Sequence, residues 1–133
     1  MSQKNIERAR AGLEALNRRD IDALLELLHP EIELMPSLVG GIEQTVFRGR
    51  EGYRHWFEAT WETYDDVSFE PHSFRSVGDQ VVVVYTTRVR AKQSGIELEA
   101  LGAGVLTFRD GLLVRQIGYQ HPEEALKAVG LTE

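Results

Sequence analysis

Apolar residues recur three or four positions apart in the first half of the chain, and this spacing is typical of amphipathic helices. It predicts one helix over residues 3–18 and a shorter one that begins after Asp20, whose carboxylate can cap it. A third helix is expected within residues 46–66, and one of its faces is aromatic. That face consists of Tyr53, Trp56, Phe57, Thr60, Trp61 and Tyr64. So broad an apolar surface needs an equally broad partner.

The second half of the chain alternates between apolar and polar residues, as strands do. Strands are predicted over residues 31–36, 67–76, 81–91, 96–108 and 112–120, before a final helical turn that opens at Pro122. Pro71 favours an edge position for its strand, because proline cannot donate to a ladder. Helices followed by consecutive hairpins favour an α+β fold with an antiparallel sheet. We expect the aromatic helix to form the wall of a cavity inside a curved sheet.

The long hairpin made by the third and fourth of these strands is expected to turn near Ser94. This register puts Thr86 opposite Gly102 and Arg88 opposite Ala100 on the inner face of the sheet, which also holds Gly104. The two glycines remove side chains where the aromatic helix would approach. They therefore predict either close packing or open space at that point.

The other face of the same hairpin is also apolar at its centre, and a strand that is apolar on both sides is normally covered on both sides. On its first strand this outer face holds Val83, Tyr85, Thr87 and Val89. No further segment is expected to cover it. We therefore predict a homodimer through the outer face of the sheet.

The register of the last strand depends on the turn at Arg109-Asp110-Gly111. A three-residue turn would bring Val114, Gln116, Gly118 and Gln120 inward. A two-residue Asp-Gly turn would instead bring Leu113, Ile117 and Tyr119 inward. Both alternatives stay open at the level of the sequence.

The length of 133 residues fits one domain over residues 1–133. A net charge of −6 argues against binding to nucleic acid or to an anionic membrane. No apolar run is long enough to span a membrane, and the polar N-terminus does not resemble a signal peptide, so a cytoplasmic protein is expected. The segment 37–45 lacks the spacing of a phosphate-binding loop and is interpreted as a mobile loop over the cavity mouth.

Three segments resemble a known family: HPEIEL after two short helices, FRGREGYRHWF at the third helix, and VLTFRDGLLVRQIGYQHPEEAL near the end. Nearly all of residues 3–131 resembles a SnoaL-like domain of the nuclear transport factor 2-like superfamily. The resemblance implies three helices wrapped by a strongly curved antiparallel sheet in a cystatin-like cone, usually dimeric, with an internal cavity. Members include ketosteroid isomerases, polyketide cyclases, epoxide hydrolases and non-catalytic binding proteins. The fold therefore locates a site without naming its function.

Ketosteroid isomerases in this superfamily use a tyrosine on the first helix, an aspartate base at the end of the first strand, and a protonated aspartic acid on a later strand. The matching positions in this chain are Gly12, Pro36 and Gly104. All three catalytic groups are absent. Steroid isomerisation by that mechanism is excluded, because it needs both a base and an acid.

Other chemistry would still need an inward carboxylate or histidine, and the predicted inner face offers none. Its polar members, which hydrogen-bond but cannot act as bases near neutral pH, are Thr60, Thr86, Arg88, Gln116 and Gln120. Arg88 could hold a carboxylate or enolate oxygen, or it could extend to solvent or pair with an acidic neighbour. Glu31 and Glu33 are expected to be solvated. The four histidines lack metal-binding spacing, so no metal or cofactor is predicted.

The leading hypothesis is a protein that binds a small, mostly apolar molecule in the cone. Trp56, Phe57 and Trp61 would supply apolar surface beside Gly104, while Thr86, Arg88, Gln116 and Gln120 would orient the ligand. No catalytic residue is assigned. One alternative is a cyclase, isomerase or hydrolase that acts on a small carbonyl or polyketide-like substrate. The other is a non-catalytic protein-interaction module with a filled cone.

Overall fold

The computed structural model of the chain describes residues 2–36 and 46–131. The segment 37–45, interpreted above as a loop over the cavity mouth, lies outside the described residues. These ranges contain four helices: α1 (Ser2–Asn17), α2 (Ile21–Leu27), α3 (Gly49–Thr63) and α4 (Pro122–Ala128). The cap predicted at Asp20 is confirmed, since its Oδ1 accepts a hydrogen bond of 3.1 Å from the backbone N–H of Ala23.

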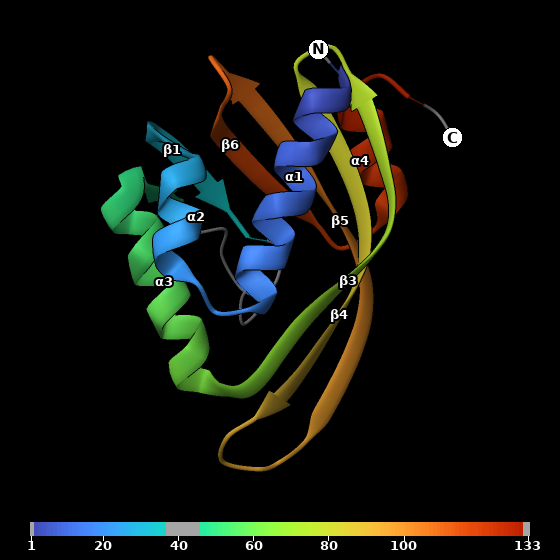
Figure 1. The fold of residues 1–133 in the computed structure, drawn as a ribbon. Helices are drawn as coiled ribbons and strands as arrows, with labels where there is room; N and C mark the ends of the chain where they lie inside the picture. Colours follow the sequence, from blue (N-terminus) through green and yellow to red (C-terminus); the bar gives the residue numbers. More distant parts are fainter. Residues whose placement is uncertain (1, 37–45, 132–133) are drawn as a thin grey trace.

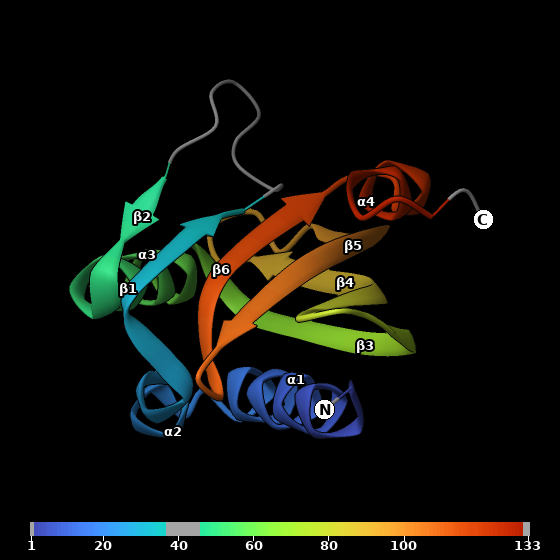
Figure 2. The same cartoon turned by 90° about the horizontal axis from the view of Figure 1, so that it is seen from above.

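The described strands form one six-stranded sheet in the order β2-β1-β6-β5-β4-β3 (Figure 1; β2 is labelled in Figure 2). They are β1 (Leu28–Met35), β2 (Phe47–Arg48), β3 (Tyr64–Val77), β4 (Gln80–Ala91), β5 (Glu97–Arg109) and β6 (Leu112–Tyr119). All neighbouring pairs are antiparallel except β1 and β6. The α+β class is confirmed, and β3, with Pro71, is an edge strand as predicted. The short β2 was not predicted from the sequence.

The helices lie on both sides of the curved sheet, with α1, α2 and α3 on the inner side and α4 on the outer side (Figure 2). The main core lies between the inner helices and the sheet. Its most deeply buried side chains are Leu28, Ile32, Leu34, Tyr53 and Val81. The site described below lies within this same layer.

Helix α4 corrects the expectation that no segment covers the outer face. Ala125 is fully buried and packs in a second cluster with Val82, Ala103 and Val105 of the outer face. One part of the outer face is therefore covered within the chain. The other part, which includes Leu101, remains exposed.

The predicted register of the long hairpin is wrong by one residue. Ala91 donates its N–H to the Ile96 carbonyl at 3.0 Å, so the connection spans the four residues 92–95, with Gly95 left-handed at φ +72°. A connection with an even number of residues cannot be centred on Ser94. The register therefore shifts by one residue, and such a shift exchanges the two faces of a strand. Tyr85 pairs with Gly102 on the inner face, and Thr86 lies outside.

The last hairpin combines both alternatives considered for its turn. Asp110 and Gly111 form a two-residue turn with φ +56° and +81°, which turns Leu113 inward beside Phe108. Between the pairs Phe108–Leu113 and Thr107–Arg115, a β-bulge adds one residue to β6. Beyond the bulge, β6 follows the register of the three-residue turn. As a result Gln116 and Gly118 also belong to the inner face, opposite Leu106 and Gly104. Val114 lies on the outer side, contrary to the three-residue alternative.

The α1–α2 connection is fastened to β3 by side chains. The Asn17 amide exchanges two hydrogen bonds of 2.9 Å with the backbone of Phe69, which satisfies part of the free edge of β3. The Arg19 guanidinium carbon lies 3.6 Å from the ring centroid of Trp61, and Arg19 donates to the Asp65 carbonyl at 2.5 Å. Trp61 therefore packs beneath this connection. Asp65 lies in β3.

Replacing Ser76 by alanine is expected to raise the free energy of unfolding by about 1 kcal/mol, because a buried hydroxyl without a partner costs free energy in the folded state. Among the described residues, the Ser76 hydroxyl is buried and has no hydrogen-bond partner. Urea denaturation of both proteins measures the change. Ser73→Ala, at an exposed position of the same strand, is the control and should change stability little. Equal destabilisation by both substitutions would contradict the prediction.

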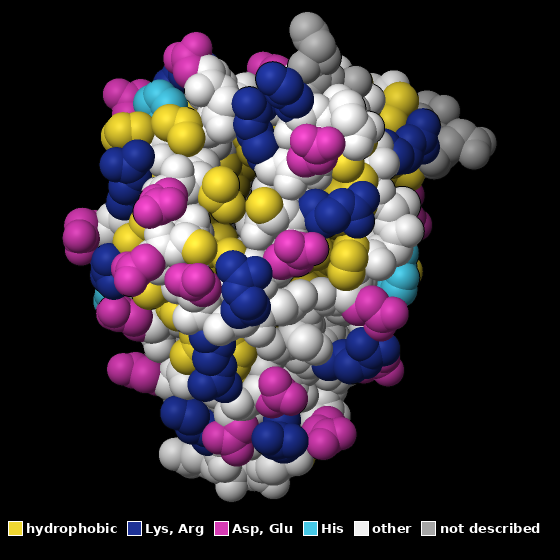
Figure 3. Space-filling view, viewed as in Figure 1, with side chains coloured by type: hydrophobic (Ala, Val, Ile, Leu, Met, Phe, Trp, Pro, Cys, Tyr) yellow, Lys and Arg dark blue, Asp and Glu magenta, His cyan; other side chains and the backbone are white. Residues whose placement is uncertain are grey.

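Charges of both signs are interspersed over the face of the molecule formed by α1 and α2 (Figure 3). Hydrophobic side chains show between them at its centre. None of the helices in the described ranges is both long enough and apolar enough to cross a membrane.

Candidate functional site

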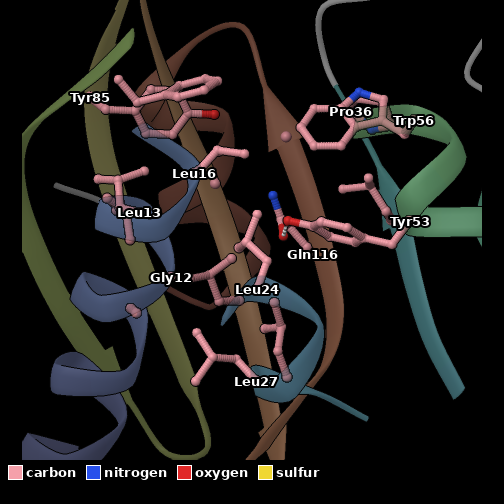
Figure 4. Close-up of a pocket in the computed structure, with 18 of the residues that line it drawn as sticks. Gly12, Leu13, Leu16, Leu24, Leu27, Pro36, Tyr53, Trp56, Tyr85 and Gln116 are labelled. Carbon is pink, nitrogen blue, oxygen red and sulfur yellow. Dashed lines mark hydrogen bonds between the residues drawn. The ribbon is translucent and has the colours of Figure 1, made fainter. Parts of the chain in front are cut away.

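A pocket with a volume of about 150 Å³ lies between the inner helices and the inner face of β4, β5 and β6 (Figure 4). Most of its wall is apolar. Leu13 and Leu16 of α1, Leu24 of α2, and Leu106 and Phe108 of β5 contribute to it. An apolar cavity of about 150 Å³ is large enough to hold a benzene ring.

Helix α3 brings the first polar group to this pocket. The Arg50 side chain donates to the Leu28 carbonyl at 2.8 Å and so fixes the start of α3 against β1. One turn later, Tyr53 is buried and donates its hydroxyl to Gln116 Oε1 of β6 at 3.3 Å. Trp56 packs edge-on against the Tyr53 ring, with centroids 5.5 Å apart. Figure 4 shows the amide nitrogen of Gln116 turned away from Tyr53 toward the interior of the pocket.

Tyr85 of β4 supplies the second polar group, and two glycines of β5 make room for its ring. A Cβ built on Gly102 or on Gly104 would lie 3.7 Å from that ring. The Tyr85 ring also meets Phe69 edge-on, with centroids 5.7 Å apart. Its hydroxyl points into the pocket from the side opposite Tyr53 (Figure 4). The sequence predicted either close packing of α3 or open space over these glycines. Tyr85 occupies that space instead.

The described residues that line the pocket include no aspartate, glutamate, histidine, lysine or cysteine. Arg8 is the one lining residue with a formal charge in the described part of the chain, and it donates to Asn5 Oδ1 at 2.7 Å. No group of histidine, cysteine and carboxylate side chains that could hold a metal ion occurs in the described ranges. The described lining can form hydrogen bonds but contains no general base near neutral pH.

A family model described as SnoaL-like domain matches residues 9–116, which is most of the chain. The chain belongs to the SnoaL-like family. No curated protein sequence matches it.

Solved structures share the fold of this SnoaL-like chain over nearly its whole length. An NTF2-like protein of Burkholderia pseudomallei is 21% identical with a TM-score of 0.79, covering 96% of this chain and 98% of that one. TerC, crystallised with polyporic acid, is 24% identical with a TM-score of 0.77, covering 95% and 97%. A provisionally assigned polyketide cyclase of Xanthomonas campestris is 20% identical with a TM-score of 0.78, covering 97% and 98%. At these identities the likeness concerns the fold alone.

The three positions that were matched from the sequence alone to the catalytic groups of ketosteroid isomerases line the pocket of this SnoaL-like domain. They are Gly12, Pro36 and Gly104. Two glycines and a proline supply neither a proton donor nor a base. The described lining therefore has no acid or base at these three positions.

Four residues predicted to bind a ligand line the pocket: Trp56, Thr60, Gly104 and Gln116. Phe57 belongs instead to the main core, and Trp61, which is partly buried, packs against that core beneath Arg19. This division follows from the width of the aromatic face, because α3 contacts both the pocket and the neighbouring helices.

The inward positions predicted for Thr86 and Arg88 are wrong, because the register of the long hairpin differs by one residue. Arg88 lies on the outer face and pairs with Glu70 and Glu99, each at 2.8 Å. Its hydrogen bond to Glu70 lowers the pKa of that carboxylate and raises the pKa of Arg88. Thr86 meets His72 Nε2 at 2.7 Å on the same face.

The inward position predicted for Gln120 is also wrong, since Gln120 is exposed beyond the end of β6 and does not line the pocket. The sequence reasoning missed Tyr85 as an inner-face residue. The signal that could have found it is Gly95, which favours a four-residue connection ending in a left-handed residue. Counting back from that connection places Tyr85 opposite Gly102.

Burial keeps both pocket phenols neutral. Desolvation raises the pKa of Tyr53 above its ordinary value and raises the pKa of Tyr85 to about 12. Both hydroxyls therefore remain hydrogen-bond donors throughout the neutral range.

Stability is expected to fall as the pH rises from about 10 to about 12, in part through Tyr85. In this window the unfolded chain loses a phenol proton that the folded protein retains, so each rise in pH favours unfolding. Below the window the contribution is fully present. Urea denaturation across this range measures the slope, which should be smaller in Tyr85→Phe than in the wild type. Identical slopes in the two proteins would contradict the assignment.

Proposed function

We propose that this SnoaL-like protein binds a small, mostly apolar molecule in the pocket between α1, α3 and the sheet. The observation that carries the proposal is an apolar pocket of about 150 Å³ with a few polar groups turned into it. Ligand sites of proteins commonly combine an apolar wall with a small number of orienting polar groups. The absence of acids and bases from the described lining favours binding over catalysis.

Fluorescence can test this proposal, because Trp56 lines the pocket whereas Trp61 does not. In a Trp61→Phe variant, Trp56 is the single tryptophan of the chain. Titration with single-ring probes such as toluene and acetophenone should change its emission saturably.

A blocked variant provides the control for the titration. Gly12 faces the pocket from α1, and a Cβ placed there would lie 3.7 Å from Leu27, which is an ordinary contact. Gly12→Leu should fill part of the pocket while improving the helix propensity of α1. Saturable binding that Gly12→Leu abolishes supports the proposal. No saturation with any probe, or an unchanged titration in the variant, would overturn it.

A second candidate is a polyketide cyclase-like enzyme, which is favoured by the fold likeness to the Xanthomonas protein. Such an enzyme needs a group that moves a proton, and the described lining contains no aspartate, glutamate or histidine. We therefore favour ligand binding over enzymatic activity as the function of this pocket. Turnover of a small carbonyl substrate that survives in a variant with a filled pocket would separate any activity from this site.

We also propose that the predicted homodimer uses the part of the outer face that α4 leaves exposed. Leu101 is 53% exposed there, beside acidic side chains on β3 and β5 and the basic Arg88 and Arg90 of β4. Stripes of opposite charge are complementary to a second copy related by a two-fold axis. Leu101→Lys should favour monomers in sedimentation equilibrium, whereas Leu98→Lys, on the other face, should not. A wild-type monomer at all concentrations would refute the proposal.

A further inference from the structure

We infer that the pocket is built for an uncharged single-ring carbonyl compound, whose oxygen accepts hydrogen bonds from the Tyr85 hydroxyl and the Gln116 amide. This inference rests on the proposed binding function and names its ligand class. Four observations carry it: one donor without a partner, one donor held in place, the absence of complementary charge, and the volume of the pocket.

The Tyr85 hydroxyl is a donor without a partner. It has no hydrogen bond to any described residue, although the ring is largely buried between Phe69 and the glycines of β5. A Cβ on Gly104 would lie 3.8 Å from this hydroxyl, so the oxygen sits directly over the glycine and toward the pocket. A hydroxyl that faces an apolar space is stabilised when it finds a hydrogen-bond partner there. A ligand oxygen in the pocket would provide one.

The Gln116 amide is the donor held in place. Tyr53 donates to its Oε1 at 3.3 Å, so the carbonyl end of the amide is already engaged. The amide nitrogen, which can only donate, is left facing the pocket (Figure 4). Tyr53 is 2% exposed and cannot turn away to solvent. Tyr53 therefore acts as a positioning residue that fixes the direction of the Gln116 N–H groups.

The charges of the described lining residues favour an uncharged ligand over an ion. A cation would have no carboxylate partner among the described lining residues, and burying an unpaired charge is strongly unfavourable. An anion would meet one cation, Arg8, which is bound to Asn5 and lies against the Gly111 turn. Uncharged donors facing an apolar space match an uncharged acceptor, such as a ketone or aldehyde oxygen.

The volume of about 150 Å³ limits the size of the molecule. A cavity of about this size accommodates one aromatic ring. Acetophenone, one ring with one carbonyl, is a suitable probe. Cumene has nearly the same shape and lacks the acceptor. Because cumene is also the more hydrophobic molecule, each ligand is compared between protein variants and not with the other ligand.

The experiment measures the affinity of both probes for wild type, Tyr85→Phe and Gln116→Met by calorimetry. Acetophenone should bind about tenfold more weakly to each variant, whereas the affinity for cumene should change by less than about twofold. The carbonyl stretch of bound acetophenone should lie at lower wavenumber in wild type than in Tyr85→Phe, because a hydrogen bond weakens the C=O bond.

Tyr53→Phe tests the positioning role. It should weaken acetophenone binding in the wild-type background and have no further effect in Gln116→Met, since Tyr53 acts through Gln116. An effect of the same size in both backgrounds would refute that role.

The outcomes separate this inference from the proposal on which it rests. Equal weakening of both probes by Tyr85→Phe, or no weakening of either, would overturn the carbonyl assignment and leave the binding function standing. Failure of both probes to bind to the wild-type protein would overturn the two together.

Discussion

Replacing Phe57 by alanine should lower the free energy of unfolding by about 3–5 kcal/mol, the range found for large aromatic residues in protein cores. Phe57 is 7% exposed and lies in the main core, with its ring centroid 6.3 Å from that of Trp61. The sequence interpretation made Phe57 part of the ligand surface. The structure buries it in the main core and outside the pocket lining, so the cost of its loss should appear as stability.

Urea denaturation of the wild type and Phe57→Ala measures this loss, provided that the m-value is unchanged. Phe57→Leu is the matched control, because it keeps most of the apolar volume and should cost less than about 1.5 kcal/mol. The leucine variant should also keep its affinity for the probes, since Phe57 does not line the pocket. A loss of affinity without a loss of stability would restore the earlier interpretation of Phe57 as a ligand contact.

The secondary structure could be predicted because each element repeats its signal over many residues. The aromatic positions of α3 recur over four turns, and β4 and β5 alternate over 12 and 13 residues. An error of one residue at an end does not change such an element. For the same reason the α+β class, and the SnoaL-like family to which the three quoted segments pointed, are confirmed by the topology and the family match.

The two faces of a strand, in contrast, depend on a single residue in a loop. The connection between β4 and β5 has four residues and not the odd number that was assumed. Arg88 therefore lies on the outer face, and Tyr85 lies on the inner face in the pocket. Gly104 was placed correctly, because the shift of one residue exchanged the faces of β4 and left the face of β5 as predicted. Gln116 was placed correctly for a different reason. The three-residue turn that would bring it inward is absent, but the bulge in β6 shifts the register by one residue and has the same effect. Neither the bulge nor the outer packing of α4 leaves a strong local signal in the sequence.

The two glycines beneath Tyr85 should respond differently to alanine. Gly102→Ala is expected to cost about 1–3 kcal/mol of stability, whereas Gly104→Ala should cost much less. A Cβ on Gly102 would lie 3.2 Å from the Tyr119 carbonyl oxygen, which is backbone held in the sheet and cannot easily move. At Gly104 the nearest atoms would be 3.7 Å away, an ordinary contact.

The pair therefore separates a glycine required by close backbone approach from one that leaves room for a ligand. Gly104→Ala should fold with nearly wild-type stability and bind acetophenone more weakly, because the added methyl group lies 3.8 Å from the Tyr85 hydroxyl that holds the carbonyl. Gly102→Ala should be less stable and, where folded, should keep more of its affinity. Denaturation and calorimetry on the two variants give both quantities. If the two substitutions cost the same stability, the Tyr119 carbonyl can yield and Gly102 has no packing role of its own. Unchanged affinity in Gly104→Ala would mean that the ligand does not reach the part of the pocket next to Tyr85.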